Sequence, residues 1–225
     1  MATTSVESTA SASTAVSDAA QHVTGLRAVI FDFDQTLTVV PAIAEHKIKP
    51  RFDDKLPNMG YLVEAFGGAE RLKCLLQALA ALRSQWQTEL IIVSFEERDL
   101  ILAVLRLIGA DEYFGLVQDG LEGSVFGWQE VWGAAGRPVS NKGHFIAALM
   151  EARGWSKDKV LFIDDQPDNI KSATPVCRTH WVREAKGMTM EDIHSLQTTG
   201  CIGFAPSSAA PSVPSSRAVT SVESV

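Results

Sequence analysis

The chain has 225 residues, 46% of them hydrophobic, and a formal net charge of -7 at pH 7. This length and apolar content predict one domain with a hydrophobic core. The acidic balance and the scattered basic residues exclude a polyanion-binding surface, so no nucleic-acid partner is expected. No apolar run approaches the roughly 18 residues of a membrane span, so no membrane partner is expected either.

The two ends of the chain differ in composition from its middle. Among residues 1–20, fifteen are Ala, Ser or Thr, and among residues 205–225, fourteen are Ser, Ala or Pro. Such segments bury too little apolar surface to offset the entropy of ordering. We therefore predict disordered tails over 1–25 and 201–225, with a folded domain at 26–200 between them.

The three cysteines are far apart and odd in number, which argues against a disulfide framework or a zinc site and indicates a reducing compartment. A cytoplasmic location is therefore expected. The N-terminal segment is rich in hydroxyl side chains but contains acids and no arginine before residue 27. That composition argues against an organellar transit peptide, although this alternative stays open.

Between residues 26 and 200, strand-like and helix-like segments alternate. Five short apolar segments predict buried strands: Val29–Asp32, Leu90–Ser94, Leu116–Val117, Val160–Ile163 and His180–Val182. Helical spacing of apolar residues, together with capping residues, predicts helices at 69–86, 100–108, from 140 or 141 to Gly154, and at 167–174. Residues 119–138, with several glycines and two tryptophans, indicate a loop or a small hairpin.

This alternation predicts an α/β fold with a doubly wound, mostly parallel sheet, a Rossmann-like core. In such a sheet, the carboxyl ends of all parallel strands meet at one edge, where ligands bind. Reactive or phosphate-binding side chains stand at three of these ends, and we expect them to converge there: Asp32, Asp34, Ser94, Asp164 and Asp165.

The run after the first strand suggests what this edge does. Asp32 and Asp34 follow the apolar residues 28–31 and repel one another, so a cation is expected to hold them. Carboxylate oxygens are the ligands that Mg²⁺ prefers, and a carboxylate beside a metal can attack an electrophile. The pair therefore indicates a metal-assisted site with a carboxylate nucleophile.

Four motifs, in order along the chain, resemble those of the haloacid-dehalogenase-like (HAD) superfamily, whose members are mostly phosphatases. Asp32-Phe33-Asp34-Gln35-Thr36 is similar to its Asp-x-Asp-x-Thr motif, and Ser94 at a strand end is similar to its second motif. Lys142 before a helix resembles the third, and Asp164-Asp165 with Asp168 beyond resembles the fourth. The resemblance covers about residues 26–196.

The resemblance implies a role for each motif residue. Asp32 would be the nucleophile that forms an aspartyl-phosphate, and Asp34 the general acid and base. Lys142 and Ser94 would be catalytic and would bind the phosphoryl oxygens. The implied cofactor is Mg²⁺, held by the Asp32 carboxylate, the Asp34 backbone carbonyl and Asp164, with Asp165 binding a metal water or orienting the site.

Each of these residues also has a simpler interpretation. Asp34, Asp165 and Asp168 are residue types that form turns. Ser94 could cap a helix that starts near Glu96, and Lys142 could be a solvated surface lysine. Gln35 and Thr36 are expected to act through backbone geometry rather than as reagents. Lys157 and Lys159 are rivals of Lys142, but they precede a strand and are expected at the opposite edge.

The acid at position 34 favours a leaving group that needs a proton, so phosphate esters rather than alkyl halides.

Residues 39–66 are too short for a full helical cap and predict a minimal cap or flap with an open site. Residues Phe162–Asp165, Asn169-Ile170 and Gly187–Thr189 resemble the magnesium-dependent phosphatase group of this superfamily. Possible substrate contacts after the first motif are Glu45, His46, Lys47, Lys49 and Arg51, and Trp128 and Trp132 could line an opening.

Two classes of function remain open at this point. The favoured one is a phosphomonoester hydrolase whose partner is a phosphorylated substrate, either a small metabolite or a phosphoprotein. A phosphomutase is a variant within the enzyme class. The alternative is a non-catalytic protein that keeps the fold and binds partners through its tails.

Overall fold

The structure is a computed structural model that describes residues 25–43, 58–115, 123–133 and 142–202. Residues 1–24 and 203–225 of the predicted tails and the strand expected at Leu116–Val117 lie outside these residues, as does half of the segment 39–66. Cys201 and Ile202 are buried in the core, so the packed domain extends beyond the boundary expected at residue 200. Among the described helices, none combines the length and apolar character that crossing a membrane requires.

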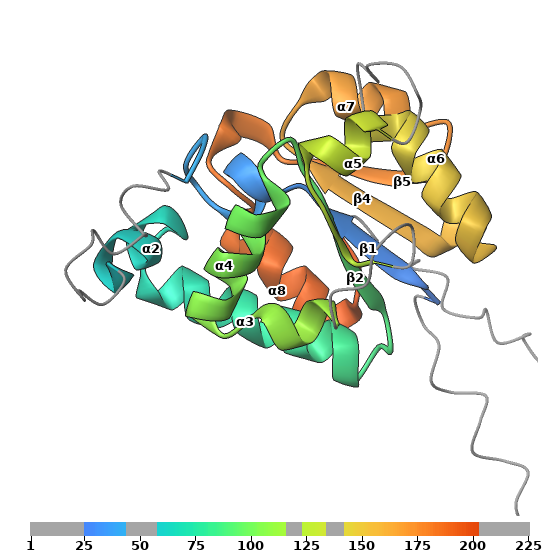
Figure 1. The fold of residues 1–225 in the computed structure, drawn as a ribbon. Helices are drawn as coiled ribbons and strands as arrows, with labels where there is room; N and C mark the ends of the chain where they lie inside the picture. Colours follow the sequence, from blue (N-terminus) through green and yellow to red (C-terminus); the bar gives the residue numbers. More distant parts are fainter. Residues whose placement is uncertain (1–24, 44–57, 116–122, 134–141, 203–225) are drawn as a thin grey trace, which may run out of the picture.

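A five-stranded parallel sheet forms the centre of the molecule, in the order β3-β2-β1-β4-β5 (Figure 1). The strands are β1 Ala28–Phe31, β2 Glu89–Val93, β3 Val125–Phe126, β4 Val160–Asp164 and β5 Arg178–Trp181. The predicted α/β fold with a doubly wound parallel sheet is confirmed. Because β1 lies in the middle, its carboxyl end is flanked by those of β2 and β4.

Alternate residues of each strand point to opposite faces and enter two separate hydrophobic clusters. In β1, Val29 and Phe31 belong to one cluster, and Ala28 and Ile30 to the other. The sheet therefore needs a helical layer on each face, which explains why its central strands are apolar throughout.

The two helical layers are seen in Figure 1. The layer over Val29 and Phe31 contains α2 Met59–Ala65, α3 Ala69–Ser84, α4 Arg98–Ile108 and α8 Met190–Thr199. The layer over Ala28 and Ile30 contains α5 Trp128–Gly133, α6 Lys142–Arg153 and α7 Pro167–Ala173. Short helical turns are present at Phe33–Leu37, Asp111–Phe114, Lys157–Lys159 and Arg183–Ala185.

The expectation of a loop or hairpin at 119–138 is wrong for its described part. Val125 and Phe126 pair in parallel with Ile92 and Val93 and extend the sheet as β3. The next residues form α5, whose Val131 is buried in the core. A two-residue strand is too short to show an alternating pattern, which explains the error.

The last strand also differs from the expectation of a core strand at His180–Val182. It spans Arg178–Trp181 at the edge of the sheet, and its residues are only partly buried. Besides α5, the described helices α2 and α8 were not predicted. For α8 the sequence does contain a signal, because Thr189 and Asp192 form a capping box at its start.

Candidate active site

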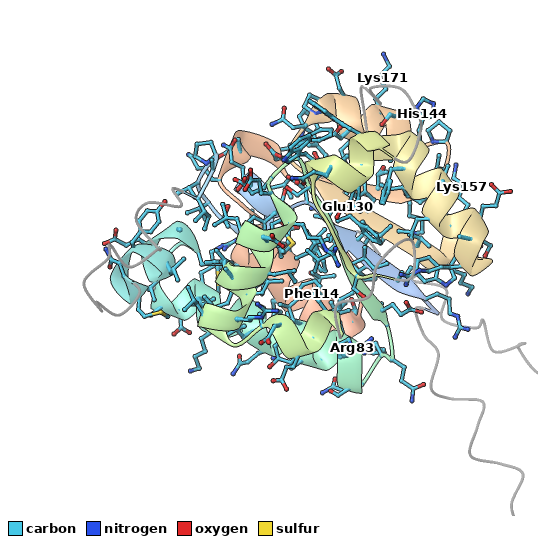
Figure 2. All side chains as sticks on the ribbon, viewed as in Figure 1. Arg83, Phe114, Glu130, His144, Lys157 and Lys171 are labelled. Carbon is cyan, nitrogen blue, oxygen red and sulfur yellow. The ribbon has the colours of Figure 1, made fainter. Side chains whose placement is uncertain are left out.

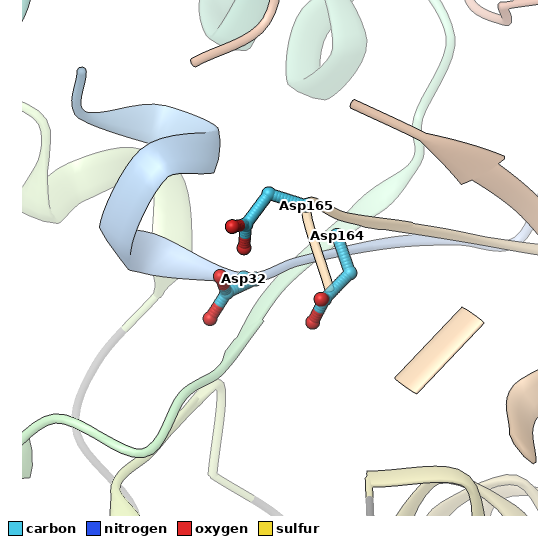
Figure 3. Close-up of side chains that lie close together, drawn as sticks. All are labelled: Asp32, Asp164 and Asp165. Carbon is cyan, nitrogen blue, oxygen red and sulfur yellow. The ribbon is translucent and has the colours of Figure 1, made fainter. Parts of the chain in front are cut away.

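Three acids meet where β1 and β4 end side by side. Phe31 pairs with Ile163, and the amide of Asp32 donates to the carbonyl of Ile163 (2.9 Å). This register places Asp32 next to Asp164 and Asp165, and all three side chains are buried. One carboxylate oxygen from each lies within 4.8 Å of the others, and the three groups face one another in Figure 3.

Lys142, the first residue of α6, enters this acidic cluster. Its Nζ donates to Asp32 Oδ1 (2.5 Å) and to Asp164 Oδ2 (2.8 Å), and its side chain is fully buried. The neighbouring Gly143 allows this approach, because a Cβ there would collide with the backbone of Ser172 in α7. The structure thus excludes a solvated surface position for Lys142. The rival Lys157, labelled in Figure 2, lies in the turn Lys157–Lys159 before β4, at the opposite end of that strand from Asp164.

The charges of this cluster influence one another. Burial raises the pKa of Asp32 to about 7, with Asp164 adding to the rise and Lys142 opposing it. Burial alone would lower the pKa of Lys142, but Asp32 and Asp164 outweigh it and the pKa is raised. Lys142 is therefore charged at neutral pH, and its charge opposes the rise in the pKa of Asp32.

Asp34 is not part of the three-carboxylate cluster. Burial raises its pKa to about 8, with further rises caused by the charges of Asp32 and Glu96. Its Oδ1 is buried, and among the described residues no hydrogen-bond partner reaches it. A carboxyl group that is protonated near neutral pH and has an unpaired oxygen is suited to exchanging a proton with a ligand.

Several neighbours fix the carboxylates and were not identified from the sequence as site residues. Asn169 in α7 donates to both oxygens of Asp164 (3.2 Å each), and the amide of Gln166 donates to Asp164 Oδ1 (2.7 Å). The hydroxyl of Thr36 donates to Asp32 Oδ2 (3.3 Å). Thr36 thus acts through its side chain as well as through the backbone. Asn169 lies five residues after Asp164, in the first turn of α7, and that spacing was the available signal.

The turn after Asp32 is attached to a distant segment of the chain. Gln35 has a left-handed backbone (φ 54°), and its side-chain amide donates to the carbonyl of Ala185 (2.6 Å). The amides of Gly187 and Met188 donate to the carbonyls of Gln35 (3.0 Å) and Thr36 (2.9 Å). These bonds stabilise the left-handed conformation, which costs energy in a residue with a side chain. The expected backbone role of Gln35 agrees with this arrangement.

Arg71 on α3 links the same two segments, and the sequence gave no sign of this role. Its guanidinium donates to the carbonyls of Leu37 (2.9 Å), Phe66 (2.8 Å) and Met188 (3.2 Å). Burial lowers the pKa of Arg71 to about 10, which still leaves it charged at neutral pH. Gly187 (φ 77°) is required beside it, because a Cβ there would meet an Arg71 nitrogen at 2.6 Å.

Ser94 lies directly after β2, as expected. Its side chain is buried, its amide donates to the carbonyl of Phe126 (3.0 Å), and its Oγ accepts from the amide of Glu96 (3.1 Å). The helix α4 starts at Arg98 with Glu97 as its N-cap, so the interpretation of Ser94 as the cap is wrong. Ser94 therefore shapes the turn at the carboxyl end of β2.

The remaining predicted residues divide into near and distant ones. Asp165 accepts from Gln166 through its side chain (2.6 Å) and from the Trp181 indole through its carbonyl (2.9 Å). Asp168 is exposed in the first turn of α7 and does not join the acids. Trp128 and Trp132 lie on α5. The possible contacts at residues 45–51 lie outside the described residues.

The acidic cluster fits a divalent metal ion. Asp32, Asp164 and Asp165 supply three buried carboxyl groups, and Lys142 supplies one ammonium group. When all are ionised, negative charge remains in excess, which is costly in a buried site unless a cation balances it. Oxygen ligands grouped within 4.8 Å are the set that a hard cation such as Mg²⁺ takes.

The fold and the site together define a doubly wound α/β protein with a carboxylate–lysine cluster at the carboxyl edge of its sheet. No protein-family model and no curated protein sequence matches the chain. Solved structures with a similar fold include a haloacid dehalogenase-like hydrolase from Streptococcus pneumoniae. The two sequences are 14% identical, the TM-score is 0.43, and the alignment covers 78% of this chain and 92% of that one.

Two further solved structures are similar to the same degree. One is a HAD-superfamily hydrolase of subfamily IA from Geobacter sulfurreducens, with 17% identity, a TM-score of 0.43, and coverage of 78% of this chain and 98% of that one. The other is a putative beta-phosphoglucomutase from Thermotoga maritima, with 17% identity, a TM-score of 0.43, and coverage of 75% and 96%. At these values, the likeness carries no argument about activity, substrate or metal.

Proposed function

We propose that the protein is a HAD-like, Mg²⁺-dependent phosphomonoester hydrolase that works through an aspartyl-phosphate on Asp32. The observation that carries this proposal is the contrast between two acids in one turn. Asp32 accepts a hydrogen bond from the Lys142 ammonium (2.5 Å), which opposes the rise in its pKa, whereas Asp34 has a buried Oδ1 without a hydrogen-bond partner among the described residues and a pKa raised to about 8 by burial and by Asp32. One acid is prepared to attack, and the other carries a proton.

The first step is phosphoryl transfer to the protein. An oxygen of Asp32 bonds to phosphorus while the ester P–O bond breaks, and the leaving alcohol takes the proton of Asp34. In the second step, water gives a proton to Asp34 and attacks phosphorus, the bond to Asp32 breaks, and inorganic phosphate leaves. The protonation states of both acids are restored, so the cycle is balanced.

Positive charge must balance the phosphoryl oxygens during both steps. Lys142 supplies one charge at a fixed position between Asp32 and Asp164. Bound at Asp32, Asp164 and Asp165, Mg²⁺ would supply further charge beside the transferring group. Asn169 and Gln166 keep Asp164 oriented through three hydrogen bonds, so the acid does not swing away when a ligand arrives.

The proposed function is tested with p-nitrophenyl phosphate and protein freed of metal by EDTA and dialysis. We expect turnover only after Mg²⁺ is added back, because three buried carboxylates then regain their cation. The measurement is the initial rate of p-nitrophenolate release over a Mg²⁺ titration. Turnover that persists unchanged in EDTA would rule out the metal-dependent mechanism.

The role of Asp34 as proton donor is tested by measuring Asp34→Asn with two phosphate esters whose leaving groups differ in their need for a proton. Benzyl alcohol is a poor leaving group and needs the proton, whereas p-nitrophenolate leaves readily without it. General-acid assistance is worth about 10²- to 10⁴-fold, so kcat/KM should fall on the order of 10²-fold more for benzyl phosphate than for p-nitrophenyl phosphate. Equal losses for the two esters would contradict a proton-donor role.

A further inference from the structure

Three aromatic side chains gather at the surface beside the acids, and no step above uses them. Phe95 follows β2, and Trp128 and Trp132 lie on α5; their exposed fractions are 40%, 37% and 46%. The ring centroids of Phe95 and Trp132 are 6.1 Å apart, and those of Trp128 and Trp132 are 5.8 Å apart. These residues, named here the aromatic rim, leave large apolar area in contact with water, which is unfavourable unless something covers it.

The aromatic rim is joined to the reacting groups through a single ammonium group. Lys142 Nζ lies 5.2 Å from the centroid of the Phe95 ring and donates to Asp32 Oδ1 at 2.5 Å. The Phe95 ring and the proposed nucleophile Asp32 thus contact the same ammonium group, that of Lys142. A phosphate ester bound with its phosphorus at Asp32 would place its leaving group within reach of the rim.

The position of Asp34 indicates that the leaving group is on this side. Glu96, which directly follows Phe95 in the chain, lies close enough to Asp34 for their charges to interact. The proposed proton donor therefore lies near the turn that carries the rim. Because Glu96 is an acid, a leaving group with its own negative charge would be repelled there.

Backbone contacts between the turn after β2 and the start of α5 fix the position of the rim. Gly127 allows the turn after β2 and the start of α5 to touch, since a Cβ there would lie 2.8 Å from the Glu96 carbonyl. The amide of Trp128 donates to that carbonyl (3.1 Å), and Arg98 pairs with Glu130 across the same contact (3.5 Å). Phe95 and Trp132 are thereby held with their rings tilted by 57° to one another in advance of any ligand.

Building on the proposed function, we propose that the aromatic rim binds the uncharged aromatic part of the substrate's leaving group. The substrate class is then a phosphate monoester of a neutral aromatic alcohol. Its ring packs on Phe95 and Trp132 while its phosphate meets Asp32 and Lys142. Ring pairs of this kind add attraction beyond area burial, and they favour flat groups over puckered ones of equal size.

The test compares two esters with leaving alcohols of similar basicity, benzyl phosphate and cyclohexylmethyl phosphate. The wild-type protein with Mg²⁺ should show a kcat/KM about fivefold higher for the benzyl ester. Trp132→Leu should remove most of this preference, chiefly through KM, and Trp132→Phe should retain part of it. Acetyl phosphate, which has no ring, should be hydrolysed equally by all three proteins.

The outcomes separate this inference from the function on which it rests. Equal kcat/KM values for the two esters, or a preference that survives in Trp132→Leu, would overturn the ring subsite while leaving the hydrolase intact. A Trp132→Leu protein that loses acetyl phosphate turnover to the same extent would assign Trp132 a purely structural role. Failure of the wild-type protein to hydrolyse any of the esters would overturn the hydrolase and the subsite together.

A second pair of substrates identifies the source of the aromatic group. Benzyl phosphate is compared with a short peptide that carries phosphotyrosine and no other charged side chain. Faster turnover of the benzyl ester assigns the rim to small molecules, and faster turnover of the peptide assigns it to phosphotyrosine. Either order supports the subsite if Trp132→Leu lowers the faster rate by about fivefold.

Discussion

Replacing Asp32 with asparagine is expected to lower kcat/KM for p-nitrophenyl phosphate by at least about 10⁴-fold, the scale seen when a covalent nucleophile is removed. Asparagine keeps the size of the side chain but cannot attack phosphorus. The fold should persist, because Lys142 keeps Asp164 as a partner at 2.8 Å. Steady-state kinetics with Mg²⁺, together with circular dichroism, measure both expectations.

The same variant tests the covalent step directly. Wild-type protein mixed with a ³²P-labelled ester and quenched in acid should carry label that hydroxylamine removes, and Asp32→Asn should carry none. The matched control is Asp111→Asn, which removes an exposed acid from the turn Asp111–Phe114. Label on Asp32→Asn, or a comparable rate loss in Asp111→Asn, would refute Asp32 as the nucleophile.

Replacing Lys142 with methionine is expected to destabilise the protein by about 3–5 kcal/mol in EDTA, the usual cost of removing one partner from a buried ion pair. Methionine fills much of the lysine volume, so the loss arises from Asp32 and Asp164, whose bonds of 2.5 and 2.8 Å to Nζ disappear. The measurement is urea unfolding at neutral pH.

Added Mg²⁺ should restore part of this loss and should stabilise Lys142→Met more than the wild-type protein, since the acids then have no other counter-ion. Lys171→Met serves as the control, because Lys171 is an exposed lysine on α7 (Figure 2) and its loss should change stability by less than about 0.5 kcal/mol. A Lys142→Met protein as stable as the wild type in EDTA would show that Lys142 does not neutralise the acids.

The fold could be predicted because its strongest signals are local. The strands around Ile30, Ile91 and Phe162 are apolar on both faces, and two of them end in acids. Those ends also located Asp32 and Asp164, because parallel strands bring their carboxyl ends to one edge. The same reasoning failed at β3, because two residues are too few to show an alternating apolar pattern. They form a strand because they pair with β2.

The unpredicted parts of the site depend on contacts between distant residues. Arg71 has the sequence context of an ordinary helical arginine, and its role comes from carbonyl groups at Leu37 and Met188. The aromatic rim likewise needs the turn after β2 to meet α5, and only the packing at Gly127 reveals that meeting. The chemical roles of Asp34 and Ser94, and the small cap expected at 39–66, stay predictions.

The order of the elements along the chain has a consequence for how the protein folds. Asp32 and Asp164 become neighbours only when β4 docks beside β1, a contact between distant parts of the sequence that forms slowly because a long loop must close first. Lys142 starts the helix just before β4, so the same unit delivers one acid and the cation that neutralises it. When β4 pairs with β1 and brings Asp164 close to Asp32, Lys142 is therefore available to reduce the repulsion between the two acids. The two strands can pair before a metal ion is bound.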